Sequence, residues 1–166
     1  FWLLACSFVQ GQTSICIGEQ LSVSSKVLGE TRTISVYLPD SYYDSTLKKT
    51  NYPVVYLLDA ETNFNYFTTL MGKLAQGIPN VPEMIVIGIE NTQRERDFGS
   101  DSDRFWQFVA DELIPLVKKQ YRCSDFRILV GHSLSGLAVV SALNKHTELF
   151  NAYIAHDPSL WWGEND

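Results

Sequence analysis

The chain has 166 residues, which is enough for one domain with a sizeable core, and 45% of its residues are hydrophobic. Aromatic residues make up 13%, a composition typical of a packed globular protein rather than a disordered one. The formal net charge is -6 and no lysine or arginine run exceeds two residues. This charge pattern argues against nucleic acid or an anionic membrane surface as the main partner.

The N-terminal residues 1–17 are expected to be the remnant of a signal peptide followed by a lead-in segment. Residues 1–9 resemble the end of an apolar signal-peptide region, and residues 9–11 resemble a small-residue cleavage site. Residues 3–6 also resemble a lipoprotein box, in which Cys6 would carry a lipid anchor. The alternative is a buried first strand. We favour export, which predicts a periplasmic, secreted or lipid-anchored protein.

Export would place Cys16 and Cys123 in an oxidising compartment, where the two thiols either pair or stay as buried thiols. The sequence leaves both states open. No apolar run approaches the roughly 20 residues of a membrane-spanning helix.

Apolar and polar residues alternate over residues 20–27 and 31–38, on either side of a turn at 28–30. This pattern predicts an antiparallel pair of strands at the start of a sheet. Continuous apolar runs are typical of strands that helices cover on both faces. Such runs occur at residues 52–58, 84–89, 126–130 and 152–155.

Helices are expected between these strands, at residues 66–75, 103–121 and 136–146. The second carries an apolar stripe at three- and four-residue steps, and Pro115 within it is expected to kink the helix. The alternation of strands and helices predicts an α/β fold with a mostly parallel sheet and helices on both faces. Ligands of such sheets bind at the carboxyl ends of the strands.

A short apolar run leads into a Gly-x-Ser-x-Ser turn at residues 131–135, and helix-forming residues follow at once. A serine nucleophile needs this arrangement, because the tight turn presents its oxygen at the N-terminus of the next helix. Gly131 and Gly136 suit the close approach of strand and helix, whereas Ser135 stands where a second glycine is usual. The alternative is an ordinary strand–helix turn. The context favours Ser133 as the nucleophile.

Backbone amides at the same edge of the sheet are expected to bind the developing oxyanion. They come from the residue after the nucleophile and from the loop after the third strand. Here those are the amide of Leu134 and an amide within residues 59–61, with Ala60 as the preferred donor.

Five segments between residues 24 and 162 carry a family resemblance: VYLLD at 55–59, IGIENTQRERD at 87–97, ELIP at 112–115, GHSLSGL at 131–137 and PSLWW at 158–162. Together they resemble the putative-esterase family of the α/β-hydrolase superfamily, which includes bacterial siderophore esterases. The resemblance implies an α/β-hydrolase fold and hydrolysis of a small-molecule ester through an acyl-enzyme on Ser133, with no metal and no organic cofactor. Ala60 replaces a usual glycine, and Asp157 replaces a usual serine.

In this fold the catalytic serine, acid and histidine follow in that order along the chain. The acid and the histidine are therefore expected beyond residue 166. Residues 18–166 would then be the N-terminal part of the domain, truncated after its sixth strand and inactive alone. His132, His146 and His156 each have a structural explanation. Asp157 is either a triad acid in a less common position or the cap of the following turn.

Four further side chains are candidates for contact with the substrate. Arg94 and Arg96 could bind an anionic group, or they could pair with neighbouring acids and order their loop. Trp161 is expected either to form an aromatic wall for the substrate or to pack beneath a lid. Asp157 would add a negative charge beside the site.

The leading hypothesis is an exported serine esterase. The alternatives are a non-catalytic binding module on the same fold and an acyltransferase. The sequence specifies neither the ester substrate nor the oligomeric state.

Overall fold

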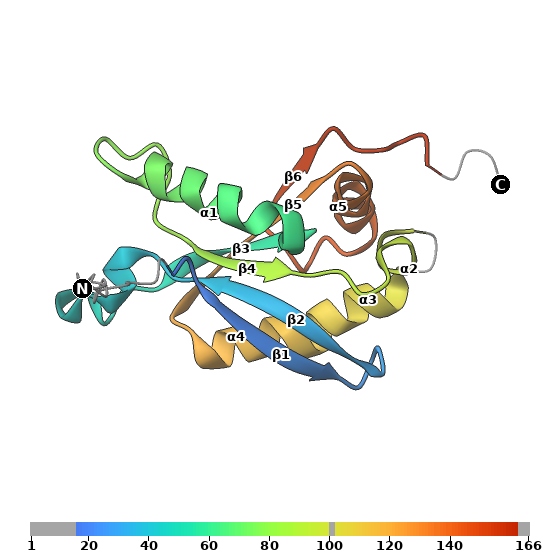
Figure 1. Ribbon diagram of the computed structural model, residues 1–166, viewed down its shortest axis with the longest axis horizontal. Helices are drawn as coiled ribbons and strands as arrows, with labels where there is room; N and C mark the ends of the chain where they lie inside the picture. The colour runs from blue at the N-terminus through green and yellow to red at the C-terminus, as the bar shows by residue number, and fades with distance from the viewer. Residues whose placement is uncertain (1–15, 100–101, 163–166) are drawn as a thin grey trace, which may run out of the picture.

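The computed structural model describes residues 16–99 and 102–162. The predicted signal-peptide region and Cys6 lie outside the described residues. A six-stranded sheet forms the centre of the molecule, in the strand order β1-β2-β4-β3-β5-β6 (Figure 1). Its strands are β1 (Glu19–Ser25), β2 (Glu30–Tyr37), β3 (Tyr52–Leu58), β4 (Ile85–Ile89), β5 (Cys123–His132) and β6 (Ala152–His156).

The strand directions confirm the prediction of a mostly parallel sheet. β1 and β2 form an antiparallel hairpin, and β2 is also antiparallel to β4. The other three neighbouring pairs, β4–β3, β3–β5 and β5–β6, are parallel. The carboxyl ends of β3, β4, β5 and β6 therefore lie along one edge of the sheet, which is called the carboxyl edge below.

Helices cover both faces of the sheet, also as predicted. On one face, Phe64 and Phe67 of α1 pack against an apolar cluster that includes Val55 and Val130. The larger core lies on the other face, where strand residues pack against α3, α4 and α5. No helix in the described part of the chain is long and apolar enough to cross a membrane. The helices are α1 (Ala60–Ala75), α2 (Arg94–Phe98), α3 (Asp103–Phe108), α4 (Ile114–Gln120) and α5 (Leu134–Lys145).

The single helix expected over residues 103–121 is interrupted. A π-helical segment, Val109–Leu113, joins α3 to α4. Pro115 has no amide hydrogen, and in a regular helix its ring would clash with the carbonyl group of Asp111. The wider π turn just before Pro115 accommodates both the missing hydrogen bond and the proline ring. The expected kink is therefore observed as a π-helical segment.

Other boundaries also differ from the sequence prediction. α1 begins at Ala60, six residues before the expected start, because the polar residues of its first turn hide the apolar periodicity. α2 and two short 3-10 helices, Asp40–Tyr43 and Ser45–Leu47, were not predicted. Segments this short carry too few residues to establish a helical period.

The two cysteines described do not form a disulfide. Cys16 is exposed, whereas Cys123 is partly buried at the start of β5. Burial raises the pKa of the Cys123 thiol to about 11, so this thiol stays protonated and unreactive near neutral pH.

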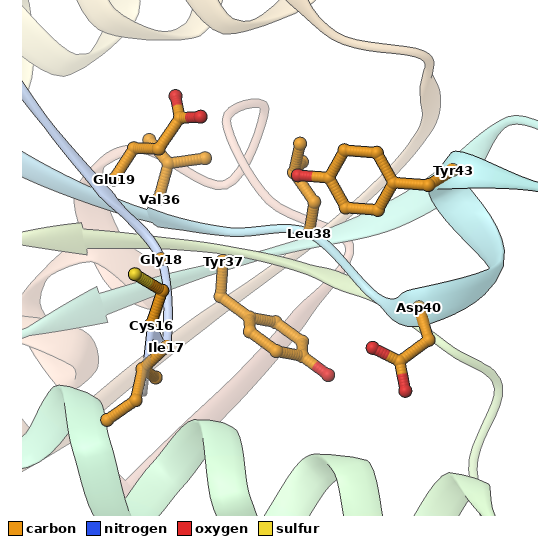
Figure 2. A pocket seen from close by; sticks show the side chains of 9 residues that line it. All are labelled: Cys16, Ile17, Gly18, Glu19, Val36, Tyr37, Leu38, Asp40 and Tyr43. Carbon is orange, nitrogen blue, oxygen red and sulfur yellow. The ribbon is translucent and has the colours of Figure 1, made fainter. Parts of the chain in front are cut away.

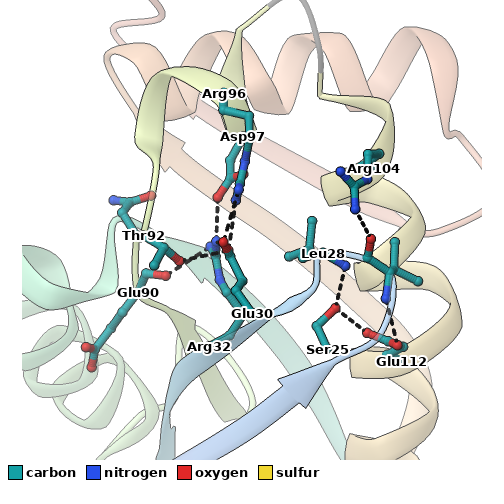
Figure 3. Close-up of polar contacts among 12 residues, drawn as sticks. Ser25, Leu28, Glu30, Arg32, Glu90, Thr92, Arg96, Asp97, Arg104 and Glu112 are labelled. Atoms are coloured by element: carbon teal, nitrogen blue, oxygen red, sulfur yellow. Dashed lines mark hydrogen bonds and ion pairs between the residues drawn. The ribbon is translucent and has the colours of Figure 1, made fainter.

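The β1–β2 hairpin is tied to the π segment through Glu112. Its carboxylate accepts hydrogen bonds from the Ser25 hydroxyl at 2.6 Å and from the backbone amides of Lys26 at 2.9 Å and Val27 at 3.2 Å (Figure 3). The ELIP segment thus has a structural role, because Glu112 satisfies amides of the hairpin turn that would otherwise lack a partner.

A buried ion cluster joins β2 to α2 (Figure 3). Arg32 is fully buried and its guanidinium lies 2.6 Å from the Asp97 carboxylate and 2.9 Å from that of Glu30. Arg96 binds Glu30 through both terminal nitrogens and also contacts Asp97. These bonds fix the segment that follows β4 against the sheet.

The ion cluster predicts how stability depends on pH. Hydrogen bonds from Arg96 and Arg32 lower the pKa of Glu30 from 4.5 to about 2, although partial burial opposes them. A lowered native pKa stabilises the fold fully above pH 4.5, and this contribution is lost as the pH falls towards 2. Glu30→Gln should therefore reduce the free energy of unfolding at pH 7 by about 1–3 kcal/mol and flatten its decline between pH 4.5 and 2.

Denaturant unfolding curves of the full-length protein at a series of pH values would measure both effects. Glu148→Gln is the matched control, because Glu148 is exposed and makes no ion pair with any described residue. An acid slope in Glu30→Gln equal to that of the wild type would contradict the stabilising role of this cluster.

Candidate functional site

Three residues with unusual backbone conformations gather at the carboxyl edge. Asp59, Ser133 and Asp157 have positive φ angles of 53°, 59° and 43°, and they are the only described residues other than glycine that do. Each one directly follows the last residue of a parallel strand, β3, β5 or β6. Such conformations are strained for side chains other than glycine, and they concentrate at functional sites.

Ser133 occupies the tight turn between β5 and α5, with φ 59° and ψ -120°. Its amide donates to the carbonyl of His156 at 3.1 Å, and its own carbonyl accepts the amide of Leu137 at 3.0 Å. The residue after it, Leu134, is the first of the 12 residues of α5. Ser133 therefore stands at the N-terminus of a helix, where the helix dipole favours negative charge.

Gly131 is required by the close approach of strand and helix, as the sequence predicted, whereas Gly136 lies against the end of β6 and the loop after it. A Cβ atom at Gly131 would lie 2.3 Å from the carbonyl oxygen of Ser135, which no real side chain tolerates. A Cβ atom at Gly136 would lie 3.0 Å from the carbonyl oxygen of His156 and 3.0 Å from the Cα atom of Pro158.

Ser135, which stands where a second glycine is usual, fits the turn without distortion. Its side chain is fully buried. Its hydroxyl accepts a hydrogen bond from the His132 amide and donates one to the His132 carbonyl, both at 2.9 Å. The hydroxyl therefore closes the turn from inside, and the departure from the usual motif leaves the turn at Ser133 intact.

The two predicted amide donors begin the two helices that start at the carboxyl edge. Leu134 is the first residue of α5, and Ala60 is the first residue of α1. Both side chains are buried. Gly88 of β4 makes room for Ala60, because a Cβ atom at Gly88 would lie 2.7 Å from the Ala60 methyl group.

Asp59, directly before Ala60, is held by a network that reaches the segment after β4. The Arg94 guanidinium donates two hydrogen bonds of 2.8 Å to the Asp59 carboxylate, and Asn91 donates a third. Burial by itself would raise the pKa of Asp59, but the hydrogen bonds from Arg94 and Asn91 outweigh it and hold the pKa below its usual value. Asp59 is therefore ionised at neutral pH.

The four candidate substrate contacts differ in how exposed they are and in whether they form ion pairs. Arg94 pairs with Asp59 yet keeps 40% of its side chain exposed, whereas Arg96 is engaged with Glu30 in the ion cluster. Arg96 also pairs with its neighbour Asp97, whereas the acid that pairs with Arg94 lies 35 residues away in the chain. Asp157 and Trp161 are exposed, and the indole of Trp161 has 65% of its surface open to solvent.

A second hydroxyl, not singled out by the sequence analysis, lies beside Ser133. Ser159 follows β6, is 7% exposed, and has its Oγ atom 3.1 Å from the Oγ atom of Ser133. Its amide also donates to the Ser133 carbonyl at 3.1 Å. The only sequence signal for it was its place in the segment PSLWW, which was expected at the same edge of the sheet as Ser133.

Within the described residues, no histidine side chain hydrogen-bonds to the Ser133 hydroxyl, whose partner is Ser159. The rings of His132 and His156 lie side by side, with centroids 4.9 Å apart and planes tilted by 37°. His146 lies beyond the C-terminus of α5, next to the ring of Trp106. Across the described residues no group of three or more His, Cys, Asp or Glu side chains is arranged to hold a metal ion.

A pocket of about 370 Å³ lies elsewhere, between the start of β1 and the end of β2 (Figure 2). Its lining includes Gly18, Tyr37, Asp40 and Tyr43. Because β2 runs antiparallel to β4, Tyr37 pairs with Val86 near the start of β4. The pocket therefore lies at the sheet edge opposite Ser133.

Comparison with known sequences finds one matching family and relatives that are named as esterases. Residues 25–166 match the family described as "Putative esterase". The chain is 28% identical over 165 residues to the ferri-bacillibactin esterase BesA of Bacillus subtilis, and 24% identical over 155 residues to the siderophore triacetylfusarinine C esterase of Aspergillus fumigatus. Each alignment covers 81% of this chain but only 56% and 53% of the two relatives, so the chain spans about half of their length.

Solved structures show the same relationship. An IroE-like serine hydrolase from Shewanella oneidensis superposes with a TM-score of 0.84 at 35% identity, over 89% of this chain and 52% of that one. The BES protein of Bacillus cereus gives a TM-score of 0.78 at 25% identity, over 93% and 66% of the two chains. These neighbours confirm the predicted α/β-hydrolase fold.

The close packing at the turn predicts a strong effect of Gly131→Ala on stability. The new methyl group would clash with the Ser135 carbonyl, and the backbone would have to shift to make room for it. We expect this shift to lower the free energy of unfolding by about 2–3 kcal/mol and the Tm of the full-length protein by roughly 5–10 °C. Gly72→Ala is the control, because its methyl group would meet only the Tyr37 hydroxyl at 3.6 Å and should stabilise α1 slightly. Equal Tm values for the two variants, measured by tryptophan fluorescence, would show that strand and helix are not in close contact.

Proposed function

Because the chain belongs to the putative-esterase family of the α/β-hydrolase superfamily, we propose that the full-length protein hydrolyses carboxylic esters through an acyl-enzyme on Ser133. The observation that carries this proposal is the strained turn at Ser133, between a buried parallel strand and a helix N-terminus. An ordinary strand–helix connection has no need of a serine with a φ of 59°.

In the proposed reaction, the Ser133 Oγ atom attacks the ester carbonyl carbon while its proton passes to a histidine base. Negative charge develops on the carbonyl oxygen, and the amides of Leu134 and Ala60 stabilise it. The alcohol then leaves with the proton from the histidine. Water, deprotonated by the same histidine, attacks the acyl-enzyme and restores the Ser133 hydroxyl as the acid product departs.

We assign the histidine base and its acidic partner to a part of the full-length protein outside residues 1–166. This assignment is supported by the placement of His132, His146 and His156, because none of their imidazole rings hydrogen-bonds to the Ser133 hydroxyl in the described part of the chain. Residues 1–166 alone would then retain only the modest catalysis that oxyanion binding provides.

We propose a siderophore ester as the substrate class. Two relatives are named for such activity, one as a ferri-bacillibactin esterase and one as a triacetylfusarinine C esterase. The exposed indole of Trp161 offers an aromatic surface, and the free face of Arg94 offers a positive charge for an anionic ligand. Arg96 and Asp157 would contribute charge at longer range. A role on exported siderophores agrees with the signal peptide expected from residues 1–17.

The proposal predicts that Ser133→Ala abolishes hydrolysis of p-nitrophenyl acetate by the full-length protein. Removing the nucleophile should lower kcat/KM by at least roughly 10⁴-fold while the Tm stays within a few degrees of the wild type. Ser141→Ala, on a later turn of α5, is the matched control and should retain normal turnover.

A fluorophosphonate probe separates the esterase from a non-catalytic binding module, because it labels only an activated serine. Labelling that disappears in Ser133→Ala but persists in Ser141→Ala supports the proposal. An unlabelled wild type would favour a non-catalytic binding module. Faster turnover with an added alcohol than with water alone would indicate an acyltransferase.

A further inference from the structure

The hydroxyl of Ser159 is buried beside the proposed nucleophile. Its Oγ atom lies 3.1 Å from the Ser133 Oγ atom, and among the described residues it hydrogen-bonds to no other group. A hydroxyl that is buried loses its hydrogen bonds to water. It needs a hydrogen-bond partner within the protein, because a buried hydroxyl without one destabilises the fold. Here that partner is the oxygen that would attack the substrate.

The loop carrying Ser159 is fixed to the nucleophile turn on both sides. The Ser133 amide donates to the His156 carbonyl and the Ser159 amide donates to the Ser133 carbonyl, each at 3.1 Å. Pro158 packs closely against Gly136 of α5, where a Cβ atom would approach its Cα atom to 3.0 Å. Ser159 therefore cannot move away from Ser133 without breaking these backbone hydrogen bonds.

The direction of this hydrogen bond follows from the proposed chemistry. Either hydroxyl could donate to the other in the resting molecule. Attack on an ester requires the Ser133 proton to point towards a base, which leaves a lone pair of Ser133 Oγ available to accept a hydrogen bond from Ser159. Ser159 then keeps its own proton throughout the reaction.

We propose that Ser159 is a positioning residue for the nucleophile, a role that rests on the esterase function proposed above. By donating to Ser133 Oγ, it holds that oxygen in one rotamer, with one lone pair free for the substrate and the proton free for the base. Catalysis depends strongly on such orientation, because a small displacement of a reacting atom slows the chemical step. Substrate binding does not depend on it.

The test compares three variants of the full-length protein. Ser159→Ala removes the donor, and Ser159→Thr keeps a hydroxyl. Ser25→Ala removes a serine hydroxyl of similar burial from β1, the outermost strand on the side of the sheet away from β5 and β6. The second-order rate of fluorophosphonate labelling and the kcat and KM for p-nitrophenyl acetate are measured for each, together with the Tm.

We expect Ser159→Ala to lower the labelling rate and kcat by about 10-fold while KM changes little. Ser159→Thr should recover most of the rate, and Ser25→Ala should keep the wild-type rate despite a lower Tm. If Ser159→Ala does not fold, Ser159→Cys, whose thiol is only a weak donor, takes its place and should show a similar loss.

Two results would overturn the proposal. One is a wild-type labelling rate in Ser159→Ala. The other is an equal loss in Ser159→Ala and Ser159→Thr with unchanged Tm values, which would mean that loop packing, and not the hydroxyl, affects Ser133. If the esterase proposal itself is wrong, the fluorophosphonate does not label even the wild-type protein. That result is distinct from both outcomes above.

Discussion

The contact between the backbones of β5 and α5 determines the geometry of the candidate site. Gly131 and the Ser135 carbonyl are so close that not even a methyl group fits between them. The chain must reverse within two residues, and Ser133 takes a left-handed conformation to do so. The same approach brings Gly136 against the loop after β6. One steric constraint thus places the Ser133 hydroxyl at a helix N-terminus and holds a second loop beside it.

Charged networks stabilise the neighbouring loops at the carboxyl edge. Asp59 is nearly buried, and its ion pair with Arg94 connects the end of β3 to α2. Arg32, fully buried, connects α2 through Asp97 to β2. A buried pair of this kind adds little net stability, but removing one partner leaves an uncompensated charge and is costly. The networks therefore limit the conformations of these loops more than they increase overall stability.

The sequence predicted those features that depend on local pattern. β3 was predicted with its observed bounds, because residues 52–58 form one apolar run. The turn at Ser133 was recognised because strand, glycine and helix signals are adjacent in the chain. The hydrogen-bond partners of Arg94 and Ser133 could not be predicted from local pattern. Asp59 lies 35 residues from Arg94 and Ser159 lies 26 residues from Ser133, and these contacts depend on which strands become neighbours.

The register of β5 against β6 makes the contact between the two serines specific. His132 pairs with His156 in the parallel ladder, so Ser133 and Asp157 leave the sheet at the same level. Asp157, which also has a positive φ angle, turns the chain back, and two residues later the Ser159 hydroxyl reaches the Ser133 hydroxyl. A slip of one residue in this ladder would point the side chains of β6 to the opposite face and carry Ser159 away from Ser133. The fixed register between β5 and β6 therefore aligns two hydroxyl groups that no local sequence pattern connects.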